Sequence, residues 1–360
     1  MNVRFLDLSV LDDEREIFLK AIDKVLQHGQ VILGPEVQEF EERIQEYYGV
    51  PKALGVSSGT DALYLALRAL DIGIGDEVIT SSISFVASAN AISLTGAVPV
   101  FADVNDDFNI NPKSIERLIT EKTKAIMPVH YAGKIADMDA INEIAKEYGL
   151  KVIEDASQAF GALYKGHFAG SLSDIGAISL NSMKILAALG DAGLLIVNDE
   201  QKYEKLSMLR YNGLNSQKVC EIVSTNAKMD TLQAAVLLQR LKSVNTLIDK
   251  RRKIADMYAA SLSKILKTPY EDSDRKNVYF TYTIVTSKRD ELFEYLTKNG
   301  IEVKIYHTNL MDEIAYRQHR GECENARELS QKKLALPCHE KMTESQVEYI
   351  IEKIKEFFED

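Results

Sequence analysis

The sequence has few cysteines and no arrangement of side chains that is typical of a metal site. Its 360 residues include only three cysteines, Cys220, Cys323 and Cys338, with no Cys-x-x-Cys pair. Neither a disulfide framework nor a cysteine metal cluster is therefore predicted, and this cysteine usage is typical of the reducing cytosol. The six histidines show no ligand spacing with cysteine or glutamate, so no metal is expected.

Signals for membranes, secretion and nucleic acids are also missing. No apolar stretch approaches the ~20 residues that cross a bilayer. The first residues run into Asp12-Asp13-Glu14-Arg15 without the apolar segment of a signal peptide. A pI near 5.2 and the lack of a long Lys/Arg block argue against nucleic-acid binding. We expect a cytoplasmic protein without membrane or nucleic-acid partners, and interpret the net charge of -11 as solubility.

The composition that is present is that of an ordinary globular protein. Hydrophobic residues at 46% and charged residues at 27% exclude disordered, collagenous and coiled-coil classes. At roughly 150 residues per domain, the length predicts two domains. Long helical segments replace short alternating elements after Met229, which places the boundary near residue 245, inside a helix. We expect a large domain over residues 1–245 and a smaller one over residues 246–360.

Short apolar runs alternate with amphipathic runs between Lys52 and Val197. This alternation is typical of βαβ units around a mostly parallel sheet with helices on both faces, so the predicted fold class is α/β. Seven strands are predicted, over residues 53–56, 77–80, 98–102, 125–129, 151–154, 177–180 and 194–197. Helical spacing predicts helices over 61–70 and 138–148, the second with Asp137 as N-cap and Gly149 past its end.

The rest of the chain is predicted as a smaller α+β unit. Long helices are expected over residues 231–247 and 250–266, and the run Lys250-Arg251-Arg252-Lys253 is interpreted as a solvated helix face. The later elements are strand-like runs at 278–285 and 301–305, a helix over 289–298 and a last helix from Thr343. No internal repeat or low-complexity segment interrupts this pattern.

A Ser/Gly/Thr turn joins the first predicted strand to the first predicted helix. The segment is Ser57-Ser58-Gly59-Thr60-Asp61, and a helix N-terminus offers free N–H groups and the positive end of the helix dipole. Gly59 lets an anion approach the backbone and Thr60 adds a hydroxyl donor, so the turn can hold a phosphate. N-capping by the same residues is the simpler alternative.

A second segment places carboxylates at the end of a predicted strand. An apolar run ends in Glu154-Asp155 and is followed by Ala156-Ser157-Gln158. Ligands of open α/β sheets bind beyond the carboxyl ends of strands, so Asp155 is expected to point into a crevice there. Unless it only caps the next turn, such a carboxylate needs a cation or a protonated ring nitrogen opposite it.

A lysine follows the predicted strand 177–180. Lys184 lies between Met183 and Ile185, and the turn Gly190-Asp191-Ala192-Gly193 comes shortly after. A lysine in this place usually faces solvent, but a partly desolvated one has a lowered pKa and forms Schiff bases. A phosphate turn, a strand-end aspartate and a lysine are the three parts that pyridoxal phosphate requires, for its phosphate, its pyridinium nitrogen and its aldehyde.

Blocks of sequence along nearly the whole chain carry a further signal. They include Gly34-Pro35-Glu36-Val37, Ser58-Gly59-Thr60-Asp61-Ala62-Leu63, Gly75-Asp76-Glu77-Val78-Ile79, Pro128-Val129-His130-Tyr131, Ile153-Glu154-Asp155-Ala156-Ser157-Gln158, Gln233-Ala234-Ala235 and Leu334-Ala335-Leu336-Pro337. In this order they resemble the DegT/DnrJ/EryC1/StrS family of fold-type I aminotransferases. The resemblance implies a large domain with a mostly parallel seven-stranded sheet between helices, and amino-sugar synthesis on nucleotide carriers.

The resemblance also implies how pyridoxal phosphate is held. Lys184 would form the internal aldimine, and Asp155 would pair with the pyridine nitrogen. Gln158 would hydrogen-bond the ring hydroxyl, and Phe85 would stack on the ring. Without the resemblance, Phe85 would be read as a core aromatic.

The phosphate of the cofactor would be held by a second set of residues. By the same resemblance, Gly59, Thr60 and Ser179 would bind it, together with Asn226 of the partner subunit, since family members build each site at a homodimer interface. The family's Asn-Ser-Arg pattern is Asn226-Ala227-Lys228 here. Lysine keeps the charge but lacks the bidentate fork of arginine, which puts contacts of Lys228 in doubt.

The implied reaction moves an amino group from L-glutamate to a keto sugar on a nucleoside diphosphate, with pyridoxamine phosphate as the intermediate carrier. A sugar dehydratase or a cyclitol aminotransferase of the same fold stays an alternative, as does a non-catalytic sensor; a dehydratase branch has histidine in place of Lys184. A nicotinamide dehydrogenase is disfavoured because Gly73-Ile74-Gly75 lacks a third glycine and precedes a strand. Tyr306 and His307 fall where the family often lines the sugar site, but a strand-end pair fits equally well.

Overall fold

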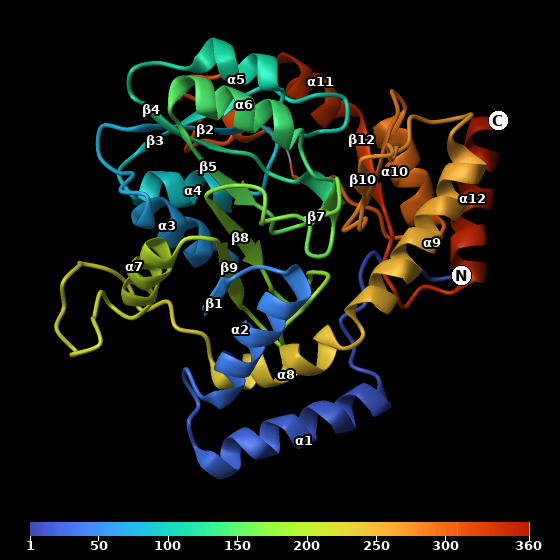
Figure 1. Ribbon diagram of the computed structural model, residues 1–360. Coiled ribbons are helices and arrows are strands. Elements are labelled where there is room, and N and C mark those ends of the chain that lie inside the picture. The colour runs from blue at the N-terminus through green and yellow to red at the C-terminus, as the bar shows by residue number, and fades with distance from the viewer. Residues whose placement is uncertain (308, 360) are drawn as a thin grey trace.

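A seven-stranded sheet forms the centre of the protein, in a computed structural model that describes residues 1–307 and 309–359 (Figure 1). In spatial order its strands are β1 (Lys52–Val56), β9 (Gly193–Val197), β8 (Ile175–Ser179), β5 (Lys151–Asp155), β4 (Thr123–Met127), β2 (Glu77–Ser81) and β3 (Val98–Ala102). Strand β9 runs antiparallel to both of its neighbours, and the other neighbouring pairs are parallel. The predicted α/β class is confirmed, and each predicted strand lies within two residues of an observed one.

Helices cover both faces of this sheet (Figure 1). One face carries α3 (Gly59–Ala69), α4 (Ala87–Leu94) and α7 (Glu200–Arg210). The other carries α2 (Pro35–Tyr48), α5 (Pro112–Leu118), α6 (Met138–Tyr148) and α8 (Thr231–Leu241), with α1 (Asp12–His28) packed on α8. Helix α6 has the predicted ends, because the Asp137 carboxylate accepts from the Ala140 N–H and Gly149 takes the left-handed conformation at φ 66°.

A second group of elements lies beside the termini, at the right of Figure 1. It contains α9 (Val244–Leu262), α10 (Arg289–Lys298) and α12 (Glu344–Glu359), packed with the two-stranded sheet β11 (Tyr282–Val285) and β12 (Lys333–Leu336) around one hydrophobic cluster. The remaining elements are the small sheet β10 (Arg275–Lys276), β6 (Leu163–Tyr164) and β7 (His167–Phe168), with η1 (Tyr131–Gly133), η2 (Leu310–Asp312) and α11 (Glu324–Lys332). The division of domains at residue 245 stays a prediction.

Some of the predicted elements in this second group are wrong. The helix break falls at Lys242 and Ser243 rather than at residues 248–249, because the Ser243 hydroxyl donates to the Arg240 carbonyl and its backbone leaves the helical region. The run 278–285 is a strand only over Tyr282–Val285. The run 301–305 makes no regular strand, because Ile301 pairs with one segment and Lys304 with another.

The interpretation of the charged run 250–253 as a solvated face is wrong for Arg251. Its guanidinium is buried, donates to the carbonyl of Cys338 at 2.7 Å, and lies 2.8 Å from a Glu340 carboxylate oxygen. The same group donates at 3.4 Å to the carbonyls of Tyr279 and Phe280. Arg251 therefore joins α9 to two other segments, whereas Lys253, two positions further along, is exposed.

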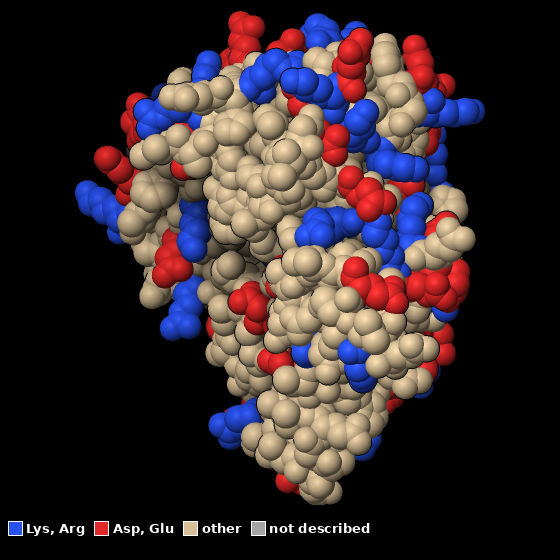
Figure 2. Space-filling view, turned by 90° about the vertical axis from the view of Figure 1, so that its left-hand side faces the viewer, with Lys and Arg blue, Asp and Glu red and all other residues tan. Residues whose placement is uncertain are grey.

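The molecular surface mixes charges of both signs. Figure 2 shows acidic and basic side chains interspersed over its face, so no field of one sign marks a partner there. Over residues 1–307 and 309–359, no helix is both long enough and apolar enough to cross a membrane.

Candidate active site

The turn between β1 and α3 combines capping with free N–H groups. Ser58 is the N-cap of α3, and its hydroxyl accepts from the Asp61 N–H at 3.0 Å. The Asp61 carboxylate in turn accepts from the hydroxyls of Ser57 and Ser58 at 2.5 and 2.9 Å. The N–H groups of Gly59 and Thr60 lie in the first turn, where a helix provides no internal acceptor. The capping alternative is thus realised by Ser58, and it leaves two N–H groups for an anion.

The end of β8 packs tightly on this turn. A Cβ atom on Gly59 would lie 2.5 Å from Cβ of Ser179 and 2.9 Å from its Cα. A Cβ atom on Gly193 would come within 2.1 Å of the Ser58 carbonyl oxygen. The structure therefore brings the predicted phosphate ligands Gly59, Thr60 and Ser179 together, around a point that only glycine lets the backbones reach.

The carboxylate of Asp155 is held at the end of β5. The residue is only 4% exposed. One carboxylate oxygen accepts from the Ser88 hydroxyl of α4 at 2.7 Å, and the other from the Ser157 N–H at 3.1 Å. Ser84 lies 2.8 Å from Ser88 and extends this network. Sequence reasoning missed Ser88; its position one turn after Ser84, beside the predicted Phe85, was the available signal.

Gln158 is tied to the short helix η1. Its side-chain oxygen accepts from the Ala132 N–H at 2.9 Å, so the NH₂ group remains a donor. The segment that leads into η1 is also held by His130, which is fully buried. Its Nε2 atom lies 2.8 Å from Glu154 Oε2. Because His130 Nδ1 accepts from the Ala136 N–H, Nε2 carries the proton and donates to Glu154. Glu154 and Asp155 are neighbours with different contacts, since Glu154 accepts from the N–H groups of Gly170 and Leu172, whereas the Asp155 charge acts on Lys184.

Lys184 is partly buried, with a negative charge nearby. Burial lowers the pKa of its amine to about 8, and the Asp155 charge opposes part of that change. The Nζ atom lies 4.5 Å from the ring centroid of Phe280. A larger fraction of this amine is neutral at physiological pH than in an ordinary lysine, which favours nucleophilic chemistry. Phe280 was not predicted, because it lies almost a hundred residues away in the sequence.

Phe85 and Asn226 are both exposed. The Phe85 side chain is 58% exposed, and its ring centroid lies 5.8 Å from that of His307. The segment of Asn226 runs beside the phosphate turn of the same chain, where the Ser57 N–H donates to the Ala227 carbonyl at 3.0 Å. Lys228 covers the ring of Tyr211 at 4.1 Å. The stacking role of Phe85 and the contribution of Asn226 to a partner's site stay predictions.

Tyr306 and His307 lie on the side of the site formed by the second group of elements. The ring of Tyr306 stacks on Phe5 at 5.9 Å and meets Phe280 edge-on at 6.1 Å. Burial and the charges of Lys184 and Lys333 hold the pKa of His307 well below its usual range. The Lys184 charge acts on His307, so these two groups face one region.

The residues fit pyridoxal phosphate by their chemistry. A glycine-lined helix N-terminus beside a serine hydroxyl suits a phosphate. Asp155 keeps acceptor capacity beyond its two serine contacts, and Lys184 is an amine of lowered pKa within range of its charge. The arrangement therefore provides each of the three parts that the cofactor needs.

Comparison with known proteins decides the family. The DegT/DnrJ/EryC1/StrS aminotransferase family matches residues 12–355. The chain belongs to this family. Aminotransferases of the DegT family depend on pyridoxal phosphate. An NtdA structure from Bacillus subtilis with bound cofactor PMP has 30% identity and a TM-score of 0.93, covering 100% of this chain and 86% of that one.

Relatives in the DegT family include named transaminases. A dTDP-3-amino-3,4,6-trideoxy-alpha-D-glucose transaminase from Streptomyces venezuelae is 40% identical, over 84% of this chain and 80% of that protein. A solved structure of S. venezuelae DesV in complex with a ketimine intermediate has a TM-score of 0.96 at 36% identity, over 100% and 99% of the two chains. A pleiotropic regulatory protein from Geobacillus stearothermophilus is 37% identical over 99% of both chains.

Proposed function

We propose that this protein is a pyridoxal-phosphate-dependent aminotransferase that moves an amino group from L-glutamate to a keto sugar on a nucleoside diphosphate. The observation that carries the proposal is the partly buried Lys184 amine of lowered pKa within range of the Asp155 charge, together with a helix N-terminus whose free N–H groups suit a phosphate. Relatives named as nucleotide-sugar transaminases support this substrate class.

The proposed roles follow from what each side chain is able to do. Bound pyridoxal phosphate supplies an aldehyde that takes up amines and a ring that stores an electron pair. Asp155 would accept a hydrogen bond from the protonated ring nitrogen and so keep the proton on it, and Ser88 holds the carboxylate in place for that contact. The Gln158 NH₂ group would donate a hydrogen bond to the ring hydroxyl, while Gly59, Thr60 and Ser179 would hold the phosphate. Lys184 would bind the aldehyde of the cofactor, and its neutral amine would be the base placed to accept the Cα proton of the donor.

A second subunit is part of the proposal, with Asn226 reaching the partner's phosphate site. A groove beside Lys184 is lined by apolar side chains that are largely exposed in the single chain, Leu8, Leu11, Ile17, Met183 and Leu189. Exposed apolar patches of this kind mark protein interfaces. The lower end of the molecule, where Figure 1 places α1, also carries few charged side chains on the face seen in Figure 2.

The function is tested by amino transfer across a panel of nucleotide keto sugars with glutamate as donor. Lys184→Ala should abolish both turnover and the visible absorbance of the lysine-bound cofactor, because no other amine takes its place. Lys165→Ala, at an exposed lysine paired with Asp139, is the matched control and should change neither. If Lys184→Ala retained both turnover and absorbance, the proposed role of Lys184 and the proposed function would be wrong.

Subunit mixing tests the shared site. When Lys184→Ala and Asn226→Ala chains are mixed, a mixed dimer contains one site with intact Lys184 and the partner's intact Asn226. Activity should therefore rise above that of either variant alone. If Asn226 serves its own chain, mixing restores nothing.

A regulatory function is the second candidate, because one relative is named a pleiotropic regulatory protein. A chain of this kind would bind the cofactor without turning over any keto sugar in the panel. Product analysis in the same assay separates amino transfer from sugar dehydration and from transfer to a cyclitol.

A further inference from the structure

Strand β12 begins with a lysine that is fully buried. Lys333 has no exposed surface, and its Nζ atom lies 5.4 Å from the ring centroid of Phe108 and 5.3 Å from that of Tyr131. Burial, together with the charge of Arg289, lowers the pKa of this amine to about 7. A methionine would fill the same space without the cost of burying an amine. A buried amine at this position therefore indicates that its N–H donor has a specific acceptor.

The donor of Lys333 is aimed at the backbone of His307. Its Nζ donates to the His307 carbonyl. The preceding carbonyl, that of Tyr306, accepts from the Tyr131 hydroxyl at 3.3 Å. The carbonyls of two consecutive residues thus accept hydrogen bonds from buried side chains of two different elements, β12 and η1. We call Lys333 and Tyr131 the carbonyl bracket.

The backbone held by the carbonyl bracket is strained. His307 has φ of 53°, a left-handed conformation that non-glycine residues rarely adopt and that costs of order 1 kcal/mol or more. This conformation sets the Tyr306 and His307 rings at 81° to each other, with centroids 4.3 Å apart. His307 Nε2 is buried and has no hydrogen-bond partner within the described part of the chain. An imidazole nitrogen in that state is available to a ligand.

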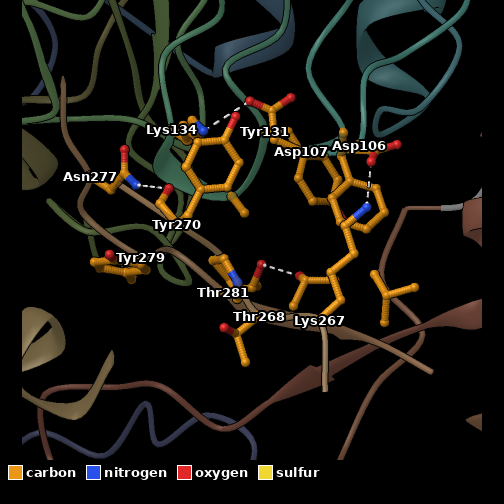
Figure 3. A pocket seen from close by; sticks show the side chains of 15 residues that line it. Asp106, Asp107, Tyr131, Lys134, Lys267, Thr268, Tyr270, Asn277, Tyr279 and Thr281 are labelled. Atoms are coloured by element: carbon orange, nitrogen blue, oxygen red, sulfur yellow. Dashed lines mark hydrogen bonds and ion pairs between the residues drawn. The ribbon is translucent and has the colours of Figure 1, made fainter. Parts of the chain in front are cut away.

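The Tyr131 side of the carbonyl bracket is itself firmly supported. Tyr131 lines the cavity shown in Figure 3, and its N–H donates to the Asn109 side chain at 3.0 Å. Across that cavity Lys134 pairs with Asp107 at 3.0 Å and Lys267 with Asp106 at 2.7 Å. Tyr131 therefore belongs to η1, the same short helix whose Ala132 N–H donates to the Gln158 side chain.

We propose that Lys333 is a positioning residue that holds His307 so that its imidazole contacts the keto sugar. The proposal rests on the aminotransferase function proposed above. Lys333 has no exposed surface, and its described contacts are the His307 carbonyl and the rings of Phe108 and Tyr131, so it is not assigned a contact with the substrate. It acts through His307, and Tyr131 acts in the same way through Tyr306.

Kinetics of Lys333→Met test this role. We expect the KM for the keto sugar to rise roughly fivefold or more, with kcat and the half-reaction with glutamate within about twofold of wild type. His307→Ala should raise KM as much, and the double variant should be no worse than His307→Ala alone, because both changes remove one contact. Additive effects, or an unchanged KM in Lys333→Met, would overturn the proposal.

Controls separate positioning from general damage. Lys332→Met changes the partly exposed neighbour that pairs with Glu328, and should leave KM and stability unchanged. Tyr131→Phe keeps the ring but removes the bond to the Tyr306 carbonyl, so a smaller rise in KM is expected even if Lys333→Met folds poorly. Wild-type KM in Tyr131→Phe would contradict the bracket.

A second readout needs no turnover. Histidine resonances of the cofactor-free protein, assigned with His307→Ala, report the pKa of His307 by NMR. The Lys333 charge lowers that pKa, as do burial and Lys184, so Lys333→Met should raise it. An unchanged His307 titration would contradict the contact. If no keto sugar is turned over but the titration shifts, the proposed function fails while the bracket stands.

Discussion

The two walls of the site are built in different ways. The wall predicted to face the cofactor, which we call the cofactor wall, comes from strand ends and helix starts of the central sheet. Its Asp155 carboxylate is held by the nearby Ser157 N–H and by the Ser88 hydroxyl of α4. The opposite wall comes from segments far along the chain. There Phe280, Tyr306 and His307 depend on contacts with Arg251, Tyr131 and Lys333.

Because of this difference, we expect the cofactor wall to tolerate few substitutions and the opposite wall to tolerate more. The cofactor wall needs a phosphate turn, a carboxylate and an amine, and the sheet edge presents all three with little freedom. The opposite wall presents rings on a strained backbone held by buried cations. Changes in the first wall are therefore expected to abolish chemistry, and changes in the second to alter stability and substrate choice.

The largest effect is expected at the cofactor wall, from Asp155→Asn. The neutral amide no longer stabilises a proton on the ring nitrogen, so kcat should fall by roughly 10²–10³-fold. Cofactor binding should persist, because the phosphate turn is untouched. Steady-state assays and the cofactor absorbance measure the two. Asp191→Asn, at an exposed carboxylate that accepts from Asn181, is the control, and full activity in Asp155→Asn would remove the distinction between the walls.

At the opposite wall, Arg251→Met should be costly for stability. It leaves Glu340 without its partner and several carbonyls without a donor, so unfolding free energy should fall by about 3 kcal/mol. Lys253→Met, two positions on, removes only an exposed pair with Glu344 and should cost about 0.5 kcal/mol or less. Urea denaturation measures both. Equal losses would mean that the burial of Arg251 contributes nothing.

Gly59→Ala should disturb the phosphate turn by overlap. Its Cβ would meet Ser179 at 2.5 Å, which costs about 1–3 kcal/mol in strain and displaces the turn. Weaker binding of pyridoxal phosphate is expected by titration. Gly73→Ala is the matched control, because its nearest neighbour lies 3.4 Å away. Unchanged affinity in Gly59→Ala would place the phosphate elsewhere.

The smallest effect is a pH shift at Lys184. In the cofactor-free protein, Schiff-base formation with added pyridoxal phosphate should rise with pH and reach half its maximum near pH 8, because only the neutral amine attacks and burial lowers the pKa to about 8. Asp155→Asn removes the charge that raises this pKa, so the profile should move to lower pH. Absorbance of the product follows the reaction. A shift to higher pH would mean that Asp155 does not act on Lys184.

Local signals were enough to propose most residues of the cofactor wall, whose roles stay predictions. Strand-end position marked Asp155, the Ser/Gly/Thr turn marked Gly59 and Thr60, and an apolar setting marked Lys184. The family resemblance added Gln158, Ser179 and the stacking role of Phe85. Ser88 was not predicted, because nothing in the sequence around a helical serine indicates that its hydroxyl donates to a carboxylate 67 positions away.

The sequence by itself determined the sheet, its helices and the order of the cofactor-binding motifs, because hydrophobic periodicity and turn chemistry act over a few residues. Only the tertiary structure decided that Arg251 is buried inside a charged run, that Phe280 covers Lys184, and that Lys333 holds His307. These contacts join residues that lie 26 to 96 positions apart, where no local pattern relates one partner to the other. Burial of a charge becomes visible only when the surrounding elements are in place.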